Sequence, residues 1–203
     1  MATKGKTKSA SGKRGYSDLH EHIELLRDAG LLMEVDRDIN KDTEMHPLVR
    51  WQFRGGVAEE DRKAWLFNNV TDSKGRKYDI PVLVCGLAAN RAVYRLGMGC
   101  EMDEIKETWI HALNNPVDPN LVESKDAPAH DLVFEGADLL TGNGLDAIPV
   151  PISTPGWDNA PYFASSHFIT KDPATGIQNM GNYRAMVKAP NRLGFNPSVE
   201  LRT

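Results

Sequence analysis

The sequence predicts a two-part protein, in which an α/β (α+β) N-terminal domain precedes a mostly β portion. Helix-like and strand-like patterns alternate up to about residue 115, which is typical of a mixed α/β domain. Prolines and glycines then interrupt the chain as far as residue 161. Beyond them, two apolar stretches flank a Pro/Gly turn at residues 172–176, which indicates a β-hairpin.

These patterns divide the 203 residues into four segments. We expect a disordered basic tail at 1–15, the N-terminal domain at 16–115, a linker at 116–128 and the β-rich portion at 129–203. Lysine and arginine lie in the tail among Ser, Thr and Gly without an acidic residue, which favours a solvated terminus. The less favoured alternative is an arm that touches RNA or an acidic partner.

The first helix is predicted to begin at an N-cap, Ser17, and to end at Gly30. Leu19, Ile23 and Leu26 recur within it at helical spacing. The next elements are expected as a strand at 31–39, a short helix at 44–53, strands at 63–70 and 80–87, and helices at 90–99 and 102–115.

In the last of these helices, Ile105, Trp109 and Leu113 are expected to form an inward-facing stripe. After the linker, residues 130–139 and 147–152 are expected as short extended pieces, and residues 165–172 and 177–189 as the paired strands of the hairpin.

Composition excludes several classes of protein. A net charge of −4 gives no support for nucleic-acid binding, which depends on clustered Lys and Arg. No apolar run approaches the roughly 20 residues that span a bilayer, and the start lacks the apolar core of a secretory signal. Cys85 and Cys100 are too few for a disulfide framework and are expected as free, buried or half-buried thiols. We therefore predict a cytoplasmic protein that binds neither nucleic acid nor membrane.

Short catalytic motifs do not assign a function. The stretches GMGCEMD and GNGLDAI begin like dinucleotide fingerprints but lack the third glycine in place. Neither a phosphate-binding GxxxxGK[ST] loop nor an HExxH metal motif occurs.

A longer pattern is more informative. The hairpin region reads DNAPYF, FITKDPATGIQNMGNYRAMV and KAPNRLGFNP. It combines a strand, a D-P-x-T-G turn, an Asn, and an Arg five residues after that Asn. In these features it resembles the flavin-dependent UbiD-like decarboxylase family, and the likeness extends in order over roughly residues 16 to 200. Upstream, DLHEHIELLRDAGLLMEVDRDINKDTEMHPLVR resembles the opening helix and strand of that family.

The resemblance implies part of a split β-barrel flavin-binding domain in the β-rich portion. It implies reversible decarboxylation of an aromatic or α,β-unsaturated acid, with prenylated FMN, a divalent metal such as manganese, and K+ as a further candidate ion. By position in the family pattern, Arg184 would be catalytic and Asn179 would bind the metal. Asn179, Gly181, Asn182, Tyr183 and Arg184 would line the cofactor.

The residue types suit these roles. An amide oxygen is a hard ligand for a divalent ion. Arg presents a planar fork to a carboxylate, and its pKa is too high for it to donate the proton. Residues five apart in a regular strand face opposite sides, so a site shared by Asn179 and Arg184 requires a bulge, expected at Gly181–Asn182. In the alternative, Arg184 pairs with a surface carboxylate and Asn179 ends a turn.

Family proteins continue well beyond this length, and the resemblance places a metal-binding His and Glu, the Glu pair that works with the Arg, and most of the substrate pocket in that further part. Three interpretations follow. The chain is a subunit of a split enzyme, whose second UbiD-like subunit supplies the Glu and His residues in a homo- or hetero-oligomer. It is a non-catalytic binding or regulatory subunit of a (de)carboxylase assembly. Or it is a truncated flavin-binding module. We favour the first.

Overall fold

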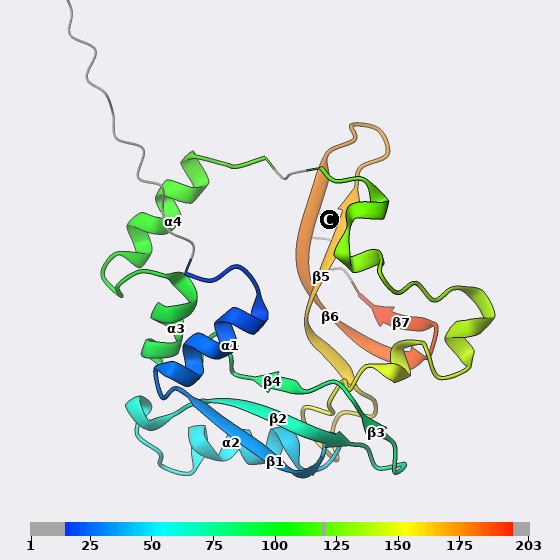
Figure 1. Ribbon diagram of the computed structural model, residues 1–203, viewed down its shortest axis with the longest axis horizontal. Helices are drawn as coiled ribbons and strands as arrows, with labels where there is room; N and C mark the ends of the chain where they lie inside the picture. Colours follow the sequence, from blue (N-terminus) through cyan, green and yellow to red (C-terminus); the bar gives the residue numbers. More distant parts are fainter. Residues whose placement is uncertain (1–14, 119–120, 197–203) are drawn as a thin grey trace, which may run out of the picture. The chain divides into compact units, whose positions relative to one another are not determined.

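The computed structural model describes residues 15–118 and 121–196, which form two compact units (Figure 1). The first unit contains the described residues up to Met33, with Ala58–Ala64 and Cys85–Val117. The second contains Glu34–Val57, Trp65–Val84 and the described residues from Asp118 onward. The predicted tail lies outside the described residues except for Gly15, as do residues 119–120 of the predicted linker and 197–203 of the β-rich portion. The predicted domain bounds stay a prediction.

The first unit is helical, with α1 (Leu19–Asp28), α3 (Arg91–Met98), α4 (Ile105–Asn114) and a single 3-10 turn, η1 (Glu59–Asp61). Helix α1 was predicted one residue too early, because its N-cap is Asp18 and not Ser17. The Asp18 carboxylate accepts the backbone N–H of Glu21 at 2.9 Å, which satisfies a free donor of the first turn. Ser17 instead donates its hydroxyl to the Glu21 carboxylate at 2.5 Å.

Helix α3 has both of its ends fixed by local chemistry. The Asn90 side chain accepts the N–H of Val93 at 2.7 Å, and Gly99 ends the helix with a φ of 66°, a conformation that glycine adopts without strain. Helices α1 and α3 pack together in this unit, and the imidazole Nε2 of the buried His22 lies 2.7 Å from the Gly86 carbonyl oxygen.

The inward stripe predicted for α4 is wrong. Trp109 is exposed, and the side chain of Leu113 is 76% exposed. The spacing places Ile105, Trp109 and Leu113 on one face of the helix, but only Ile105 is half-buried. None of the described helices is long and apolar enough to cross a membrane.

A four-stranded sheet, most of whose residues belong to the second unit, has β2 at its centre. Strand β2 (Ala64–Thr71) lies beside β1 (Leu32–Asn40) and pairs antiparallel with β3 (Lys77–Tyr78) and β4 (Val82–Val84). Helix α2 (Met45–Arg54) buries Met45 and Val49, and its Gln52 side chain accepts the indole N–H of Trp65 at 3.2 Å. These elements confirm the strands and helix predicted between residues 31 and 87.

The segment before the hairpin contains short 3-10 turns: η2 (Ser124–Asp126), η3 (Pro128–His130), η4 (Gly136–Leu140) and η5 (Leu145–Ala147). The extended piece predicted at 130–139 is therefore wrong. Gly136 has a φ of 56°, which an extended strand does not accommodate, and no described strand pairs with this segment. Residues 148–152 are irregular and bury Val150.

A second sheet contains three antiparallel strands in the order β5-β6-β7: β5 (Tyr162–Lys171), β6 (Gln178–Ala189) and β7 (Arg192–Phe195). The predicted hairpin and its turn are confirmed. The Asp172 carboxylate accepts the N–H groups of Ala174 at 2.7 Å and Thr175 at 3.2 Å, and Gly176 has a φ of 72°. These two bonds lower the pKa of Asp172. The mixed helix-and-strand class is as predicted; closure into a split barrel stays a prediction.

Candidate functional site

The five residues predicted to form a site all lie on β6, the central strand of the three-stranded sheet. The pairing of β5 with β6 is regular from Lys171–Gln178 to Ser166–Tyr183. The bulge expected at Gly181–Asn182 is therefore wrong. The irregularity lies on β5 between Phe163 and Ser166, so that two residues of β5 stand opposite Arg184.

The regular register places the predicted residues on two faces of the sheet. Asn179, Gly181 and Tyr183 alternate with Asn182 and Arg184, since successive side chains of a strand point to opposite sides. Exposure follows the same alternation, with the first three residues half-buried and the other two exposed. The structure thus brings together Asn179, Gly181 and Tyr183 on one face, and Asn182 and Arg184 on the other.

Aromatic packing occupies the half-buried face. The rings of Phe168 and Phe195 stack with centroids 4.5 Å apart, and Tyr183 meets Phe195 edge-on at 5.2 Å. A Cβ added at Gly181 would lie 2.2 Å from the Tyr183 ring. The Tyr183 ring therefore leaves no room for a side chain at position 181, with or without a bound cofactor.

Asn179 lies near the start of β6, opposite Thr170 of β5. Its amide oxygen is a suitable metal ligand, but a divalent ion needs several more. Among the described residues, no three His, Cys, Asp or Glu side chains are grouped so as to hold a metal. A divalent ion at Asn179 would therefore need further ligands.

A hollow of about 460 Å³ opens where strands β5, β6 and β7 meet. Arg184 and Lys188 line it together with the rings of Tyr162, Tyr183 and Phe195. The Arg184 guanidinium lies over the Tyr162 ring, 5.0 Å from its centre. Among the described residues that line this hollow there is no carboxylate. The hollow is thus positively charged, with aromatic walls.

Lys188 is a functional candidate that the sequence analysis missed. The pairing of β6 with β7 is irregular between Val187 and Ala189, so Lys188 is the extra residue of a bulge. Its side chain extends over Gly194, where an added Cβ would lie 2.8 Å from the lysine Cε. The spacing of Arg184, Met186 and Lys188 at alternate positions was the available signal, because such residues share one face of a strand.

The donor set of this hollow fits a planar anion. Two cations suit a phosphate or a carboxylate, and the aromatic rings offer surfaces on which a flat ring can stack. Its volume lies within the roughly 300 to 1,000 Å³ of small-molecule sites. The residues present therefore fit a flavin mononucleotide or an aromatic acid.

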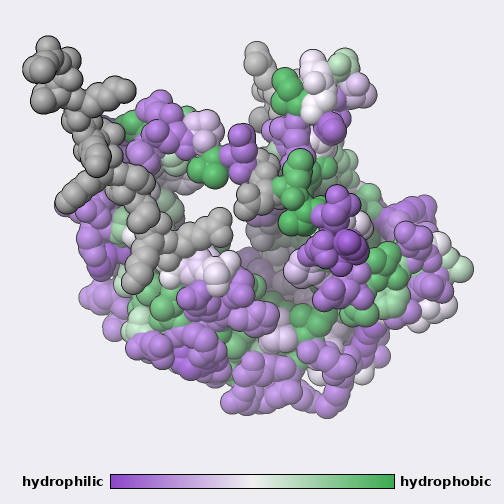
Figure 2. Space-filling model, turned by 45° about the horizontal axis from the view of Figure 1, so that its top comes forward, coloured by the Kyte–Doolittle hydropathy of each residue, from purple (hydrophilic) through white to green (hydrophobic). Residues whose placement is uncertain are grey.

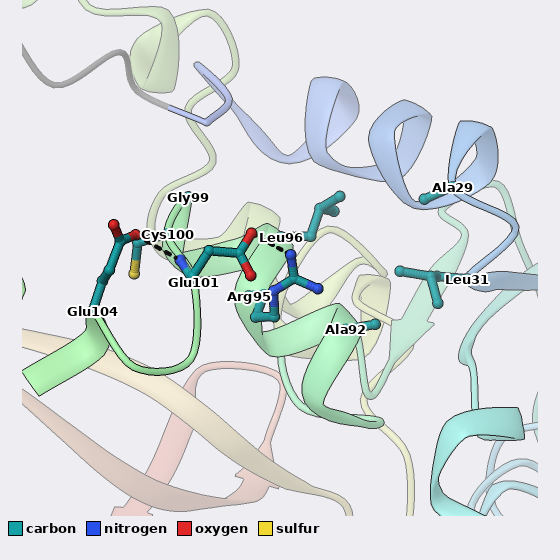
Figure 3. A pocket seen from close by; sticks show the side chains of 9 residues that line it. All are labelled: Ala29, Leu31, Ala92, Arg95, Leu96, Gly99, Cys100, Glu101 and Glu104. Atoms are coloured by element: carbon teal, nitrogen blue, oxygen red, sulfur yellow. Dashed lines mark hydrogen bonds and ion pairs between the residues drawn. The ribbon is translucent and has the colours of Figure 1, made fainter.

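Another hollow, of about 560 Å³, lies in the helical unit (Figure 3). Its polar groups largely bond to one another: Arg95 pairs with Glu101, and the Glu101 N–H is donated to the Glu104 carboxylate at 3.0 Å (Figure 3). The neighbouring Cys100 is a free, half-buried thiol, as predicted, and Cys85 is another. Because its charges are already partnered, this hollow is the weaker candidate.

Apolar side chains reach the surface in several places and interrupt the polar surface (Figure 2). Near the tip of the hairpin, the cross-strand partners Ile169 and Met180 are both exposed, as is Ile177. These three side chains form an apolar exposure at the hairpin tip, and in the other unit Trp109 and Leu113 of α4 are also exposed.

Comparison with known proteins agrees with this arrangement. Residues 120–200 match the family model described as the UbiD 3-octaprenyl-4-hydroxybenzoate carboxy-lyase Rift-related domain. The solved structure of the UbiD-class enzyme HmfF from Pelotomaculum thermopropionicum, in complex with FMN, superposes with a TM-score of 0.71 at 28% identity and covers 89% of this chain. The chain is therefore similar to part of the UbiD family.

Two curated relatives are named as decarboxylases. A gallate decarboxylase of Lactiplantibacillus plantarum is 30% identical over 168 residues, which are 80% of this chain and 32% of the relative. A phenolic acid decarboxylase of Sedimentibacter hydroxybenzoicus is 27% identical over 189 residues, 89% of this chain and 36% of the relative. The chain thus spans about a third of the length of these relatives. An evolved dimeric form of HmfF, 26% identical, was solved with prenylated FMN.

Proposed function

We propose that this chain contributes the Arg-bearing edge of the active site of a prenylated-FMN-dependent reversible (de)carboxylase acting on an aromatic or α,β-unsaturated carboxylic acid. The observation that carries the proposal is the hollow in which Arg184 and Lys188 lie beside aromatic walls without a carboxylate among the described lining residues. In a UbiD-family protein, such a hollow suits an anionic, planar cofactor and substrate.

Arg184 is given the catalytic role. Its guanidinium is held over Tyr162, so its fork is oriented before a ligand arrives. It would bind the substrate carboxylate through paired N–H donors and hold the scissile carbon–carbon bond in place. Prenylated FMN, when bound, would supply the electron sink for the loss of carbon dioxide. A guanidinium group is too weak an acid to supply the proton that replaces carbon dioxide, so another group would donate it.

The remaining cofactor contacts are proposed for Asn179, Gly181, Asn182 and Tyr183, with Asn179 as one metal ligand. Tyr183 belongs to the aromatic packing of the half-buried face and also lines the hollow, so it joins the two faces on which these residues lie. A manganese ion would need its other ligands from outside the described residues, and K+ would be a second candidate ion.

We further propose that a second UbiD-like subunit supplies the acid and the missing metal ligands. The exposed apolar side chains at the hairpin tip and on α4 support this, because a covering polypeptide would remove them from water. The substrate class follows from the names of the relatives, which act on gallate and phenolic acids.

The test is reconstitution in cells that make prenylated FMN. The tagged chain is co-expressed with a flavin prenyltransferase, alone and together with the polypeptide corresponding to the rest of its relatives. We expect a stable complex with the absorbance of bound flavin and with decarboxylation of hydroxybenzoates, and little activity from the chain alone. A complex that forms without flavin and without activity on any aromatic acid would refute the proposal.

A further inference from the structure

A cleft of about 470 Å³ lies between the outer face of α2 and the turn that follows Ser153. It is lined by Arg50, Trp51 and Arg54 of α2, and by Thr154, Pro155 and Trp157 of the turn. The helix residues recur at the three- and four-residue spacing that places side chains on one face, while the opposite face buries Met45 and Val49. The cleft is separate in sequence from the residues proposed for the decarboxylase.

Both walls of the cleft are fixed in position. The Trp51 indole lies against Gly55, at which an added Cβ would stand 2.8 Å from the indole Cε3. On the other wall, the Asp158 carboxylate accepts the Thr154 N–H at 2.9 Å and closes the turn. Arg50 ties the walls together, because it donates to the Ser153 carbonyl at 3.2 Å and to the Thr154 hydroxyl at 3.1 Å.

The two tryptophans of the cleft are left in water. Trp157 is 87% exposed and Trp51 is 68% exposed, although each indole has about 150 to 250 Å² of area to bury. Neither contributes to the core of the unit at this exposure. Large aromatic side chains on rigid supports lose little conformational entropy when a ligand binds, so they are efficient contact surfaces.

The charge of the cleft restricts the ligand. Arg50 and Arg54 contribute two guanidinium groups, and among the described residues that line the cleft there is no carboxylate. Guanidinium groups bind carboxylates through paired donors and stack on aromatic faces. We propose that this cleft binds a planar aromatic carboxylate, whose ring packs against Trp51 and Trp157 and whose carboxylate accepts hydrogen bonds from Arg54. This inference rests on the cleft residues and not on the proposed decarboxylase function.

The test is a titration of the 203-residue chain with 4-hydroxybenzoate, followed by tryptophan fluorescence and calorimetry. We expect saturable binding that Trp157→Leu and Arg54→Met each weaken at least tenfold. The matched controls are Trp109→Leu, which removes another exposed tryptophan from α4, and Arg91→Met, which removes an exposed arginine of α3. These two variants should bind as the wild type does.

Two ligand controls separate the ring from the charge. Benzyl alcohol keeps the ring without the carboxylate, and cyclohexanecarboxylate keeps the carboxylate without the aromatic ring; both should bind at least tenfold more weakly. Equal binding of either compound, or unchanged binding in both cleft variants, would overturn the proposal. The same titrations are repeated in an Arg184→Met background, which removes the guanidinium of the hollow between β5, β6 and β7. Trp157→Leu and Arg54→Met should still weaken binding at least tenfold there, which distinguishes the cleft from that hollow.

Discussion

The guanidinium group of Arg184 and the ring of Tyr162 form a cation–π pair, 5.0 Å apart, across the irregular pairing of β5 and β6. The extra residue of β5 stands opposite Arg184, so the bulge and the stacked ring act at the same place on the sheet. A bulge of this kind re-aims a side chain, and the ring then restricts the orientation of the fork. Arg184 is therefore oriented by two independent local features.

Replacing Arg184 by Lys should distinguish the effect of its positive charge on turnover from the effect of its planar guanidinium group. Lys keeps the positive charge but loses the planar fork, so turnover of the reconstituted enzyme should fall about 10- to 100-fold, while flavin content changes little. Steady-state kinetics and flavin absorbance measure the two effects. Arg192→Lys on β7, an exposed position, is the control, and wild-type turnover in Arg184→Lys would remove the catalytic role.

Replacing Asn179 by Ala should reduce the binding of both the metal and the cofactor. In the reconstituted enzyme, Asn179→Ala should lower both manganese content and bound flavin, because one oxygen ligand is lost from a shared site. Elemental analysis and absorbance give the two quantities. The neighbouring exposed Gln178→Ala should keep both. A full complement of metal and flavin in Asn179→Ala would make Asn179 a structural residue of the strand.

Lys188 should contribute affinity and not chemistry. The variant Lys188→Met keeps the length of the side chain and removes its charge, so the KM for the acid or the Kd for the flavin should rise about tenfold, with little change in kcat. Lys171→Met, at an exposed lysine of β5 outside the hollow, is the matched control. Equal effects of the two substitutions would mean that Lys188 acts only through general surface charge.

The glycine at 181 should be required for stability even in the absence of a cofactor. In Gly181→Ala the new methyl group would meet the Tyr183 ring, which Phe168 and Phe195 restrain, and we expect a loss of about 1–3 kcal/mol in the free energy of unfolding. Urea denaturation measures it. Gly194→Ala displaces only the end of the flexible Lys188 side chain and should cost less. In the double variant Gly181→Ala/Tyr183→Ala, the penalty from the added methyl group should largely disappear.

Stability should depend on the protonation of His46. Burial and the nearby Arg50 lower the pKa of this imidazole, while Asp158 opposes the shift. The unfolded chain, with a His pKa of about 6.5, therefore takes up the proton at a higher pH than the folded chain does. The free energy of unfolding should fall as the pH drops below about 6.5, until the folded-state pKa is passed. Denaturation at several pH values should show a smaller dependence in His46→Gln, and an unchanged one would contradict this assignment.

The parts of the fold that could be predicted from sequence are those set by local chemistry. The turn at residues 172–176 follows from the Asp172 side chain, the fixed φ of Pro173 and the positive φ of Gly176. The faces of β6 were harder, because the position of a bulge depends on the register with β5 and not on β6 itself. The bulge was predicted on β6 at Gly181–Asn182 but lies on β5, so Asn179 and Arg184 keep opposite faces of the sheet.

A different limit applies to α4 and to the cleft beside α2. The spacing of Trp109 and Leu113 shows that one side of a helix is apolar, but not whether anything in the chain covers it. In the same way, 106 positions (157 − 51) separate Trp51 from Trp157 in the sequence. The two tryptophans line one cleft only in the folded unit. Contacts between residues that are far apart in the sequence cannot be predicted from a local sequence pattern.

The hairpin formed by β5 and β6 has a consequence for the order of folding. Its strands are joined by six residues, 172–177, so its contacts are close in sequence and little loop entropy opposes them. Hairpins of this kind form in about 1–10 μs. We expect the strand that bears Asn179 and Arg184 to be in register early in folding, before the parts of the fold that depend on contacts between residues distant in sequence.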